Sequence, residues 1–422
     1  MIRHADYLII GSSHAALAAL HTLRMHDSEG AVTMVTRDAS LPYSPTVLPY
    51  VVSGRSQPER VFLRDDAYFR AQKVDYLSGI EVERVAADRN VVRLANGDEI
   101  GYKALLVATG AQPVVPPIPG LGGVRYHVLR TLDDAVALRA AAAGARRAVV
   151  LGAGLIGMHA AENLAHAGAD VAIVERLPHV LPGYFDADAA AMIGRAFAAG
   201  GVRLFTGREA LSIAPGESGE PGCSVVLDGG ETLPCDLLVV GVGVAPVTGL
   251  LQGSGVAVDR GVLVDDSMRS SVANIFAAGD VAQARGFYDG VKTLNGILPD
   301  AVEQGRIAGM AMAGDPGIKP YPGGVPLNTY TFFGQHAVSV GTHGEGIPGA
   351  ETFTTVDASA ARYLKIVLRD DRLLGIFGIN AAFDPGVMWE LILRRVDLAP
   401  VRERFLDAPQ DAARVLMSRT WR

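Results

Sequence analysis

Two glycine-rich loops in this chain have the residue types and spacing that bind the phosphates of a dinucleotide. The clearer one is Gly152-Ala153-Gly154-Leu155-Ile156-Gly157, which follows the apolar run 148–151. In such a loop the first glycine makes a tight turn, the second lets backbone amides approach a pyrophosphate, and the third lets a helix pack closely on a strand. The start of that helix then stabilises the phosphate charge. We therefore predict a dinucleotide site that begins at Gly152.

The residue that ends the next strand indicates which dinucleotide binds there. Glu175 closes the apolar run 170–175, about 20 residues after the glycines, where a carboxylate can accept both ribose hydroxyls and repel a 2′-phosphate. This favours NAD(H) over NADP(H). The adjacent Arg176 weakens the preference for NAD(H). The predicted NAD(H)-binding residues are Gly152, Gly154, Leu155, Ile156, Gly157, Glu175 and Gly243.

The first loop, Gly11-Ser12-Ser13-His14-Ala15-Ala16, is a degenerate version of the same pattern. Ser13 and Ala16 stand where the later glycines would be, and because both side chains are small, a phosphate and a helix can still approach. The following strand, 31–36, ends without a carboxylate, so the recognition of a ribose there stays open. From this loop alone, an ordinary βαβ unit without a ligand is the alternative.

Two later segments favour a ligand at the first loop. The run 105–113 is typical of a buried strand that enters a tight turn at Ala108-Thr109-Gly110, and the run 274–280 ends in Gly279-Asp280. With these four motifs in this order, the chain resembles the FAD-dependent pyridine nucleotide oxidoreductases. In that family the first loop binds FAD, the Ala-Thr-Gly segment lies where the chain crosses between domains, and the aspartate of Gly-Asp binds the ribityl chain of the flavin.

No lysine stands near the position that the resemblance implies for flavin N5, so negative charge on the flavin has to be met elsewhere. We expect the amino end of a helix starting near Pro299 to meet it, through the backbone near Ile297 and Leu298. The FAD-binding residues that the resemblance implies are Gly11, Ser13, His14, Ala16, Arg37, Pro45, Val82, Ala108, Thr109, Gly110, Gly279, Asp280, Ile297 and Leu298.

The positions of the cysteines indicate whether the electrons can pass through a thiol. The two cysteines, Cys223 and Cys235, lie in a turn-rich meander, where a buried or edge cysteine is the plain interpretation and a disulfide scaffold is excluded. Thiol-dependent relatives carry a cysteine before a Leu-Pro-Tyr, but here Thr46 and Val47 occupy that stretch. Hydride must then pass between nicotinamide C4 and flavin N5, and the electrons must reach another carrier.

We accordingly expect no acid or base catalyst and no metal, and the nearest catalytic candidates are Ser44, Pro45 and His159. His159 could orient the nicotinamide carboxamide or tune the flavin, or it could simply pack on a helix face. His14 could donate to a pyrophosphate or lie in solvent. Phe332 and Phe333 could form a wall against the flavin, or they could belong to the core.

The 422 residues are 49% hydrophobic and carry a formal net charge of −7, so the composition does not suggest nucleic acid or an anionic membrane surface as a partner. The order of motifs predicts an α/β fold with two Rossmann-like dinucleotide-binding domains, and the family resemblance implies a C-terminal α+β interface domain. We expect an FAD-binding domain in two parts, an NAD-binding domain between them, and the interface domain last: 1–113 and 245–318, 114–244, and 319–422.

Smaller features complete this organisation. The uncharged run 237–258 is broken by glycines and Pro246, which favours a strand and loop over a membrane span. No basic and apolar leader precedes the first strand, so we expect a cytoplasmic protein. Strand-like runs at 337–340, 363–368 and 373–379 precede a helical tail from Pro385.

Along its whole length, through 126–134 and 326–330 to Thr420-Trp421-Arg422, the chain resembles the NAD-reducing flavin subunits of phenylglyoxylate-type 2-oxoacid dehydrogenase complexes. The resemblance implies iron–sulfur and thiamine diphosphate subunits as partners, which deliver single electrons that FAD passes on as hydride to NAD⁺. One alternative is a stand-alone NADH:ferredoxin or rubredoxin reductase. The other is a non-enzymatic scaffold, against which the intact Gly152 loop and Glu175 argue.

Overall fold

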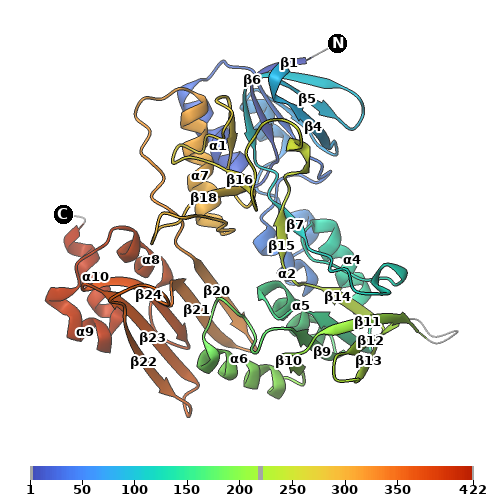
Figure 1. Cartoon of the computed structure of the whole chain (residues 1–422), viewed down its shortest axis with the longest axis vertical. Coiled ribbons are helices and arrows are strands. Elements are labelled where there is room, and N and C mark those ends of the chain that lie inside the picture. The colour runs from blue at the N-terminus through green and yellow to red at the C-terminus, as the bar shows by residue number, and fades with distance from the viewer. Residues whose placement is uncertain (1–2, 217–221, 421–422) are drawn as a thin grey trace. The chain divides into compact units, whose positions relative to one another are not determined.

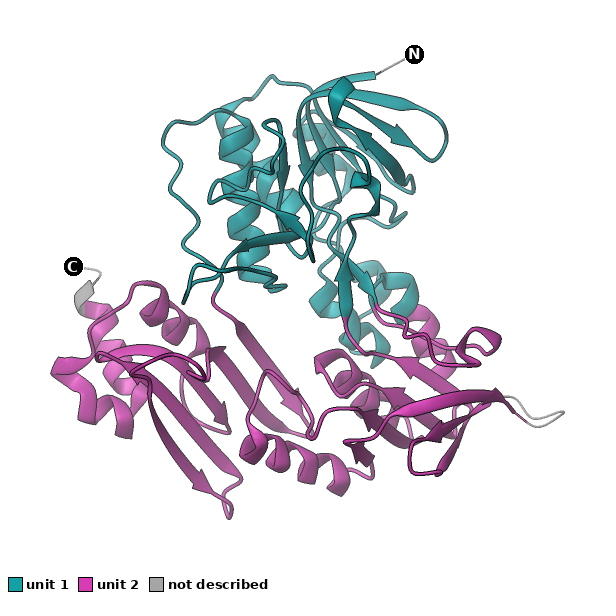
Figure 2. Cartoon of the chain, viewed as in Figure 1, with its two compact units in different colours: residues 1–113, 130–135, 244–324 teal, residues 114–129, 136–243, 325–422 magenta. Residues whose placement is uncertain are grey.

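A computed structural model describes residues 3–216 and 222–420, so Trp421 and Arg422 of the sequence resemblance lie outside the described residues. The chain forms two compact units, each built from several separate segments (Figure 2). Unit 1 contains residues 1–113, 130–135 and 244–324, and unit 2 contains residues 114–129, 136–243 and 325–422. The two loops that we predict to bind dinucleotides therefore lie in different units. The division into three domains, with the FAD-binding domain in two parts, stays a prediction.

The described part of unit 1 is organised around a seven-stranded sheet. Six strands follow the order β3-β2-β1-β6-β5-β4, and the seventh, β17, pairs with β6. Strands β1, β2, β3 and β17 run parallel to their neighbours, whereas β4, β5 and the first half of β6 form an antiparallel meander. The bounds are β1 Arg3–Ile10, β2 Val32–Val35, β3 Val74–Leu77, β4 Val82–Ala86, β5 Val91–Leu94, β6 Glu99–Val107 and β17 Ile275–Ala277. Residues 8–10, 32–35 and 105–107 of the central strands are buried because both faces of the parallel part of the sheet are covered.

Helices α1 (His14–His26) and α7 (Leu298–Met312) lie side by side over this sheet (Figure 1). Their backbones touch because α7 carries glycine at two positions of the contact. A Cβ atom on Gly305 would lie 2.2 Å from the carbonyl oxygen of Ala15, and one on Gly309 would lie 2.7 Å from that of Ala19. This close approach brings the amino ends of both helices to the same edge of the sheet.

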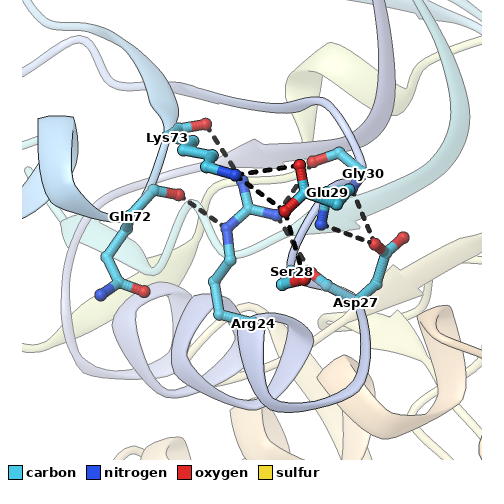
Figure 3. Close-up of polar contacts among 7 residues, drawn as sticks. All are labelled: Arg24, Asp27, Ser28, Glu29, Gly30, Gln72 and Lys73. Carbon is cyan, nitrogen blue, oxygen red and sulfur yellow. Dashed lines mark hydrogen bonds and ion pairs between the residues drawn. The ribbon is translucent and has the colours of Figure 1, made fainter.

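The other end of α1 is fixed by one arginine (Figure 3). Arg24 donates to the backbone carbonyls of Gln72, at 2.6 Å, and of Gly30, at 2.9 Å. Gln72 follows α3 (Asp66–Ala71), and the next residue, Lys73, pairs with Glu29 at 2.8 Å. These bonds satisfy carbonyls that lie outside regular structure, and they set the position of α1 relative to the strand that follows it.

In unit 2 the described part of residues 136–243 has a parallel four-stranded sheet with the order β10-β9-β8-β14. An antiparallel sheet of three strands, β11-β12-β13, follows β10 in the chain. The bounds are β8 Arg147–Leu151, α5 Leu155–His166, β9 Asp170–Glu175, α6 Ala187–Ala199, β10 Arg203–Thr206, β11 Ala210–Pro215, β12 Cys223–Leu227, β13 Thr232–Cys235 and β14 Leu237–Val240. The short strands β7 (Ala111–Pro113) and β15 (Val244–Pro246) of unit 1 pair antiparallel where the chain leaves and re-enters that unit.

The C-terminal part of unit 2 is an antiparallel sheet with the order β20-β21-β24-β23-β22, followed by helices. The bounds are β20 Leu327–Phe332, β21 Gln335–Gly341, β22 Glu351–Asp357, β23 Arg362–Arg369, β24 Arg372–Ile379, α8 Pro385–Leu393, α9 Arg402–Asp407 and α10 Pro409–Thr420. Asp186 joins this sheet to helix α6: it caps α6 and accepts hydrogen bonds from Tyr363 and Lys365.

The architecture agrees with the α/β class predicted from the sequence, and α8 begins at Pro385 as expected. The uncharged run 237–258 forms β14, β15 and a short 3-10 turn, as its glycines and proline indicate. Among the described residues, none of the helices is both long enough and apolar enough to cross a membrane.

Candidate dinucleotide sites

The first loop leaves the carboxyl end of β1 and enters α1 through a turn that requires glycine. Gly11 has φ +115°, and a Cβ atom there would lie 2.1 Å from the carbonyl oxygen of Ala108. Ser13 is the N-cap of α1, but its side chain makes no capping hydrogen bond, and the first turn contains no acidic residue. The amides at the start of α1 are thus left for an external acceptor such as a phosphate.

Two of the predicted segments meet at this loop. The amide of Ala108 donates to the carbonyl of Ile10 at 2.8 Å, which places the Ala-Thr-Gly segment beside Gly11. Thr109 donates through Oγ1 to the carbonyl of Val247 at 2.8 Å, and Gly110 accepts from the amide of Val247 at 3.0 Å. The segment therefore ties the strand that leaves unit 1 to the strand that returns.

The Gly279-Asp280 pair approaches the same loop from β17. Gly279 has φ +80°, and a Cβ atom there would lie 3.2 Å from the Cβ atom of Ala15. The carboxylate of Asp280 accepts from Arg130 Nη2 at 2.8 Å, and Arg130 Nε donates to the carbonyl of Ala111 at 2.9 Å. Sequence reasoning missed Arg130. The one signal was its place in the stretch 126–134, which the resemblance had singled out.

Helix α7 begins at Leu298, with Ile297 as N-cap and Pro299 in the first turn. No side chain caps the first turn, so its amides carry the partial positive charge of a helix amino end, which stabilises a nearby anion by about 0.3–1 kcal/mol. The segment before the helix passes Asp280: a Cβ atom on Gly296 would lie 3.3 Å from Asp280 Oδ1. Ile297, Leu298 and the Gly279-Asp280 pair therefore belong to one cluster.

A chain of hydrogen bonds joins the first loop to the stretch that replaces the thiol of relatives. His14 Nε2 lies 2.8 Å from Ser44 Oγ, and Ser44 Oγ lies 2.7 Å from Thr46 Oγ1. Burial lowers the pKa of His14, so the ring is held neutral and partnered rather than free in solvent. Pro45 lies within this turn as the first residue of a 3-10 segment, Pro45–Val47.

The two remaining FAD-site predictions are less closely tied to the loop. Arg37 is exposed just after β2. Val82 begins β4 and is buried in the core of unit 1, so it could offer only its backbone to a ligand. Asp38 is occupied with Tyr43, whose hydroxyl donates to it at 2.6 Å, and burial raises the pKa of that tyrosine. Ribose recognition at this loop therefore stays a proposal.

In unit 2 the three glycines after β8 serve three different needs. Gly152 has φ +99°, and a Cβ atom there would lie 2.5 Å from the carbonyl oxygen of Gly241. A Cβ atom on Gly157 would lie 2.0 Å from the carbonyl oxygen of Gly152, so helix α5 packs directly against the turn. At Gly154, the N-cap of α5, a Cβ atom would meet nothing within 4 Å. That open space at an uncapped helix start fits a pyrophosphate.

Glu175 ends β9 with its carboxylate facing the same loop. Oε2 accepts from the amide of Ala153 and Oε1 from the amide of Leu177, both at 2.8 Å. Leu155 and Ile156 form the first turn of α5. Gly243 lies beyond β14 at φ +126° and accepts from the amide of Val114 at 3.0 Å. Loop, acid and first turn thus form one cradle, and the chemistry of its donors and acceptors fits NAD(H).

His159 and the two phenylalanines take part in packing within unit 2. The His159 ring contacts Tyr330 edge to face at 4.5 Å, and burial lowers the pKa of His159 to about 4. Phe332 is fully buried and stacks on Phe197, and the amide of Phe333 donates to Glu162 at 2.6 Å. Phe332 belongs to the core, whereas His159 and Phe333 are partly buried, and packing accounts for the contacts of all three.

The two cysteines face each other across β12 and β13, away from both glycine loops in sequence. Cys223 pairs in register with Cys235, and the two sulfur atoms are 3.1 Å apart. Both are buried free thiols. Their mutual contact raises the pKa of Cys235, with burial adding to the rise, and lowers the pKa of Cys223. Their burial within the small sheet, rather than beside a glycine loop, favours a structural role for both.

Residues 5–307 match the family described as pyridine nucleotide-disulphide oxidoreductase. The chain is 55% identical over 423 residues to the NADH-dependent phenylglyoxylate dehydrogenase subunit epsilon of Aromatoleum evansii, covering 100% of this chain and 99% of that one. It is 31% identical to an NADH oxidase of Methanocaldococcus jannaschii, over 73% of this chain and 70% of the relative. A covalent putidaredoxin reductase–putidaredoxin complex shares the fold, with a TM-score of 0.85 at 24% identity, over 93% of this chain and 94% of that one.

Proposed function

Because the chain belongs to the pyridine nucleotide-disulphide oxidoreductase family, we propose that it is the NAD⁺-reducing flavin subunit of a phenylglyoxylate-type 2-oxoacid dehydrogenase complex. The family resemblance noted in the sequence is confirmed, and with it the enzyme class and the two cofactors, FAD and NAD(H). The finer assignment, to one kind of complex, is our proposal.

One observation supports this assignment above the others. The 55% identity to the phenylglyoxylate dehydrogenase subunit extends over the whole of both chains, so it covers both glycine loops, the Tyr43–Tyr50 stretch and the C-terminal sheet alike. In the proposed complex, iron–sulfur and thiamine diphosphate subunits oxidise the 2-oxoacid, and this chain passes the electrons to NAD⁺.

The side chains at the proposed sites suit electron transfer without thiols. Bound FAD supplies the exchange between single electrons and hydride. The amides at the start of α1 bind its phosphates, Asp280 held by Arg130 fixes its ribityl chain, and the start of α7 stabilises negative charge on the ring. In unit 2 the cradle at Gly154 binds the NAD⁺ pyrophosphate, and Glu175 selects against a 2′-phosphate.

The second candidate is a stand-alone ferredoxin or rubredoxin reductase. It is supported by a relative described as a probable ferredoxin reductase, from Castellaniella defragrans, which is 28% identical over 95% of this chain and 96% of its own. Such an enzyme also needs no cysteine where Thr46 stands. The two candidates differ in whether the chain works with fixed partner subunits.

Affinity purification of the tagged chain from its native cells distinguishes the two. We expect iron–sulfur and thiamine diphosphate subunits to co-purify, and we expect the purified complex to form NADH when supplied with phenylglyoxylate or another member of a 2-oxoacid panel. A flavoprotein that purifies alone and reduces ferredoxin or rubredoxin with NADH would overturn the complex in favour of the free-standing reductase.

A further inference from the structure

Asp300 is a buried carboxyl group that the proposed mechanism does not use. It lies in the first turn of α7 and is only 3% exposed. Its carboxyl accepts hydrogen bonds from the side-chain amide of Asn295 and from the hydroxyl of Tyr321. Among the described residues no lysine, arginine or histidine pairs with it. A buried carboxylate without a cation is costly, so its proton affinity is raised.

The groups that surround Asp300 leave it without a compensating charge. Gly324 packs closely against the carboxyl group, since a Cβ atom there would lie 2.5 Å from Asp300 Oδ2. On α7 itself the nearest charge is Glu303, a like charge that pairs with Arg306 at 2.6 Å. Burial is the main cause that raises the pKa of Asp300 to about 7.

Hydrogen bonds connect Asp300 to both segments of the proposed flavin site. Gln304 donates to Tyr321, the partner of Asp300, and accepts from the amide of Gly279 at 2.9 Å. The other partner, Asn295, precedes Gly296 and Ile297, which lead from Asp280 to the start of α7. The charge on Asp280 is met by Arg130. Asp300 therefore shares one polar network with the Gly279-Asp280 pair and with the amino end of α7.

We propose that Asp300 takes up one proton when electrons arrive on the flavin. Negative charge on the flavin ring and an ionised carboxylate in the first turn of α7 would both be stabilised by the positive amino end of α7. Because the two charges repel each other, the presence of one raises the free energy of the other. In this step the carboxylate oxygen gains a proton from solvent and becomes a carboxylic acid, and the residue itself is neither oxidised nor reduced. The inference rests on the proposed flavin site but not on the identity of the electron donor.

The test compares the FAD-loaded wild type with Asp300→Asn and with Glu303→Gln as the matched control. Glu303→Gln removes a half-exposed charge from the same helix. The flavin midpoint potential is measured between about pH 6 and 8, which brackets the expected titration. Above about pH 7, where Asp300 is ionised before reduction, the slope should correspond to as much as one more proton per two electrons in wild type and in Glu303→Gln than in Asp300→Asn. At lower pH the slopes should converge, because the carboxyl group is already protonated before the electrons arrive. Equal slopes in all three proteins would overturn the proposal.

A second measurement needs no variant, in case Asp300→Asn fails to hold FAD. The reduced-minus-oxidised infrared difference spectrum of wild type should contain a new carboxylic acid C=O band that shifts when aspartate is labelled with ¹³C. Absence of that band would refute the proton uptake. Failure of the flavin site itself is separately visible, because an Asp280→Ala protein that keeps its FAD would contradict the site whatever the proton count.

Discussion

Arg130 holds the carboxylate of Asp280 at 2.8 Å while its Nε atom donates to the carbonyl of Ala111. The two charged residues are 150 positions apart, and each is about three-quarters or more buried, with 20% and 24% of the side chain exposed. The arginine therefore fixes the orientation of the residue that we propose to bind the ribityl chain, and it links that residue to the strand that leaves unit 1.

Replacing Arg130 with methionine should weaken FAD binding roughly 10- to 100-fold, because hydrogen bonds to a charged group contribute about 1.5–3 kcal/mol and Asp280 would lose its counter-charge. FAD retained after dilution and gel filtration measures the effect. Arg203→Met, which removes an exposed arginine from an ion pair in unit 2, is the control. Full FAD retention by Arg130→Met would show that the ion pair does not support the flavin site.

Gly154→Val should abolish NADH-dependent flavin reduction while FAD stays bound. The open space at this position accepts a side chain without a clash inside the protein, but that side chain would occupy the proposed pyrophosphate site. Stopped-flow absorbance at the flavin band measures the reduction. Loss of FAD instead would mean that the two loops have been assigned to the wrong dinucleotides.

Gly157→Ala tests the packing role of the third glycine. Its methyl group would lie 2.0 Å from the carbonyl oxygen of Gly152, so α5 must shift away from the turn. We expect the free energy of unfolding to fall by about 1–3 kcal/mol, the usual cost of overpacking. Urea denaturation followed by circular dichroism measures it. A variant as stable as wild type would show that α5 is not held against the turn.

His159 should make unit 2 less stable in acid. Its pKa is lowered from 6.5 to about 4, so the unfolded chain binds more protons between these values. Stability is then complete above about pH 6.5 and falls by up to about 3 kcal/mol as the pH drops towards 4. His159→Leu should flatten this acid limb in calorimetry, while His336→Gln, an exposed histidine of the same unit, should not. An unchanged acid limb in His159→Leu would contradict the packed, neutral histidine.

The local requirements of the glycine loops could be predicted from the sequence because they are steric and short in range. The spacing alone assigns a tight turn to Gly152, the approach of a phosphate to Gly154 and the packing of a helix on a strand to Gly157. The structure gives a matching steric reason at each position. The starts of α7 and α8 were predictable for a similar reason, since proline marks the first turn of a helix.

The partners of buried polar groups could not be predicted in this way. Arg130 meets Asp280, and Glu162 meets the backbone of Phe333, across 150 and 171 positions of the chain. Such contacts depend on how strands and helices pack, which no local spacing encodes. The same holds for Asp300: its sequence position is that of an ordinary first-turn acid, and its burial depends on residues distant in sequence such as Gly324.

The central claim is that this chain is the point at which electrons from a 2-oxoacid reach NAD⁺. It is tested most directly in a purified complex that carries Gly154→Val in this subunit. The complex should lose phenylglyoxylate-dependent NAD⁺ reduction, yet it should still reduce a one-electron dye such as methyl viologen at the wild-type rate. Undiminished NADH formation by the variant complex would place the NAD⁺ site on another subunit and contradict the account.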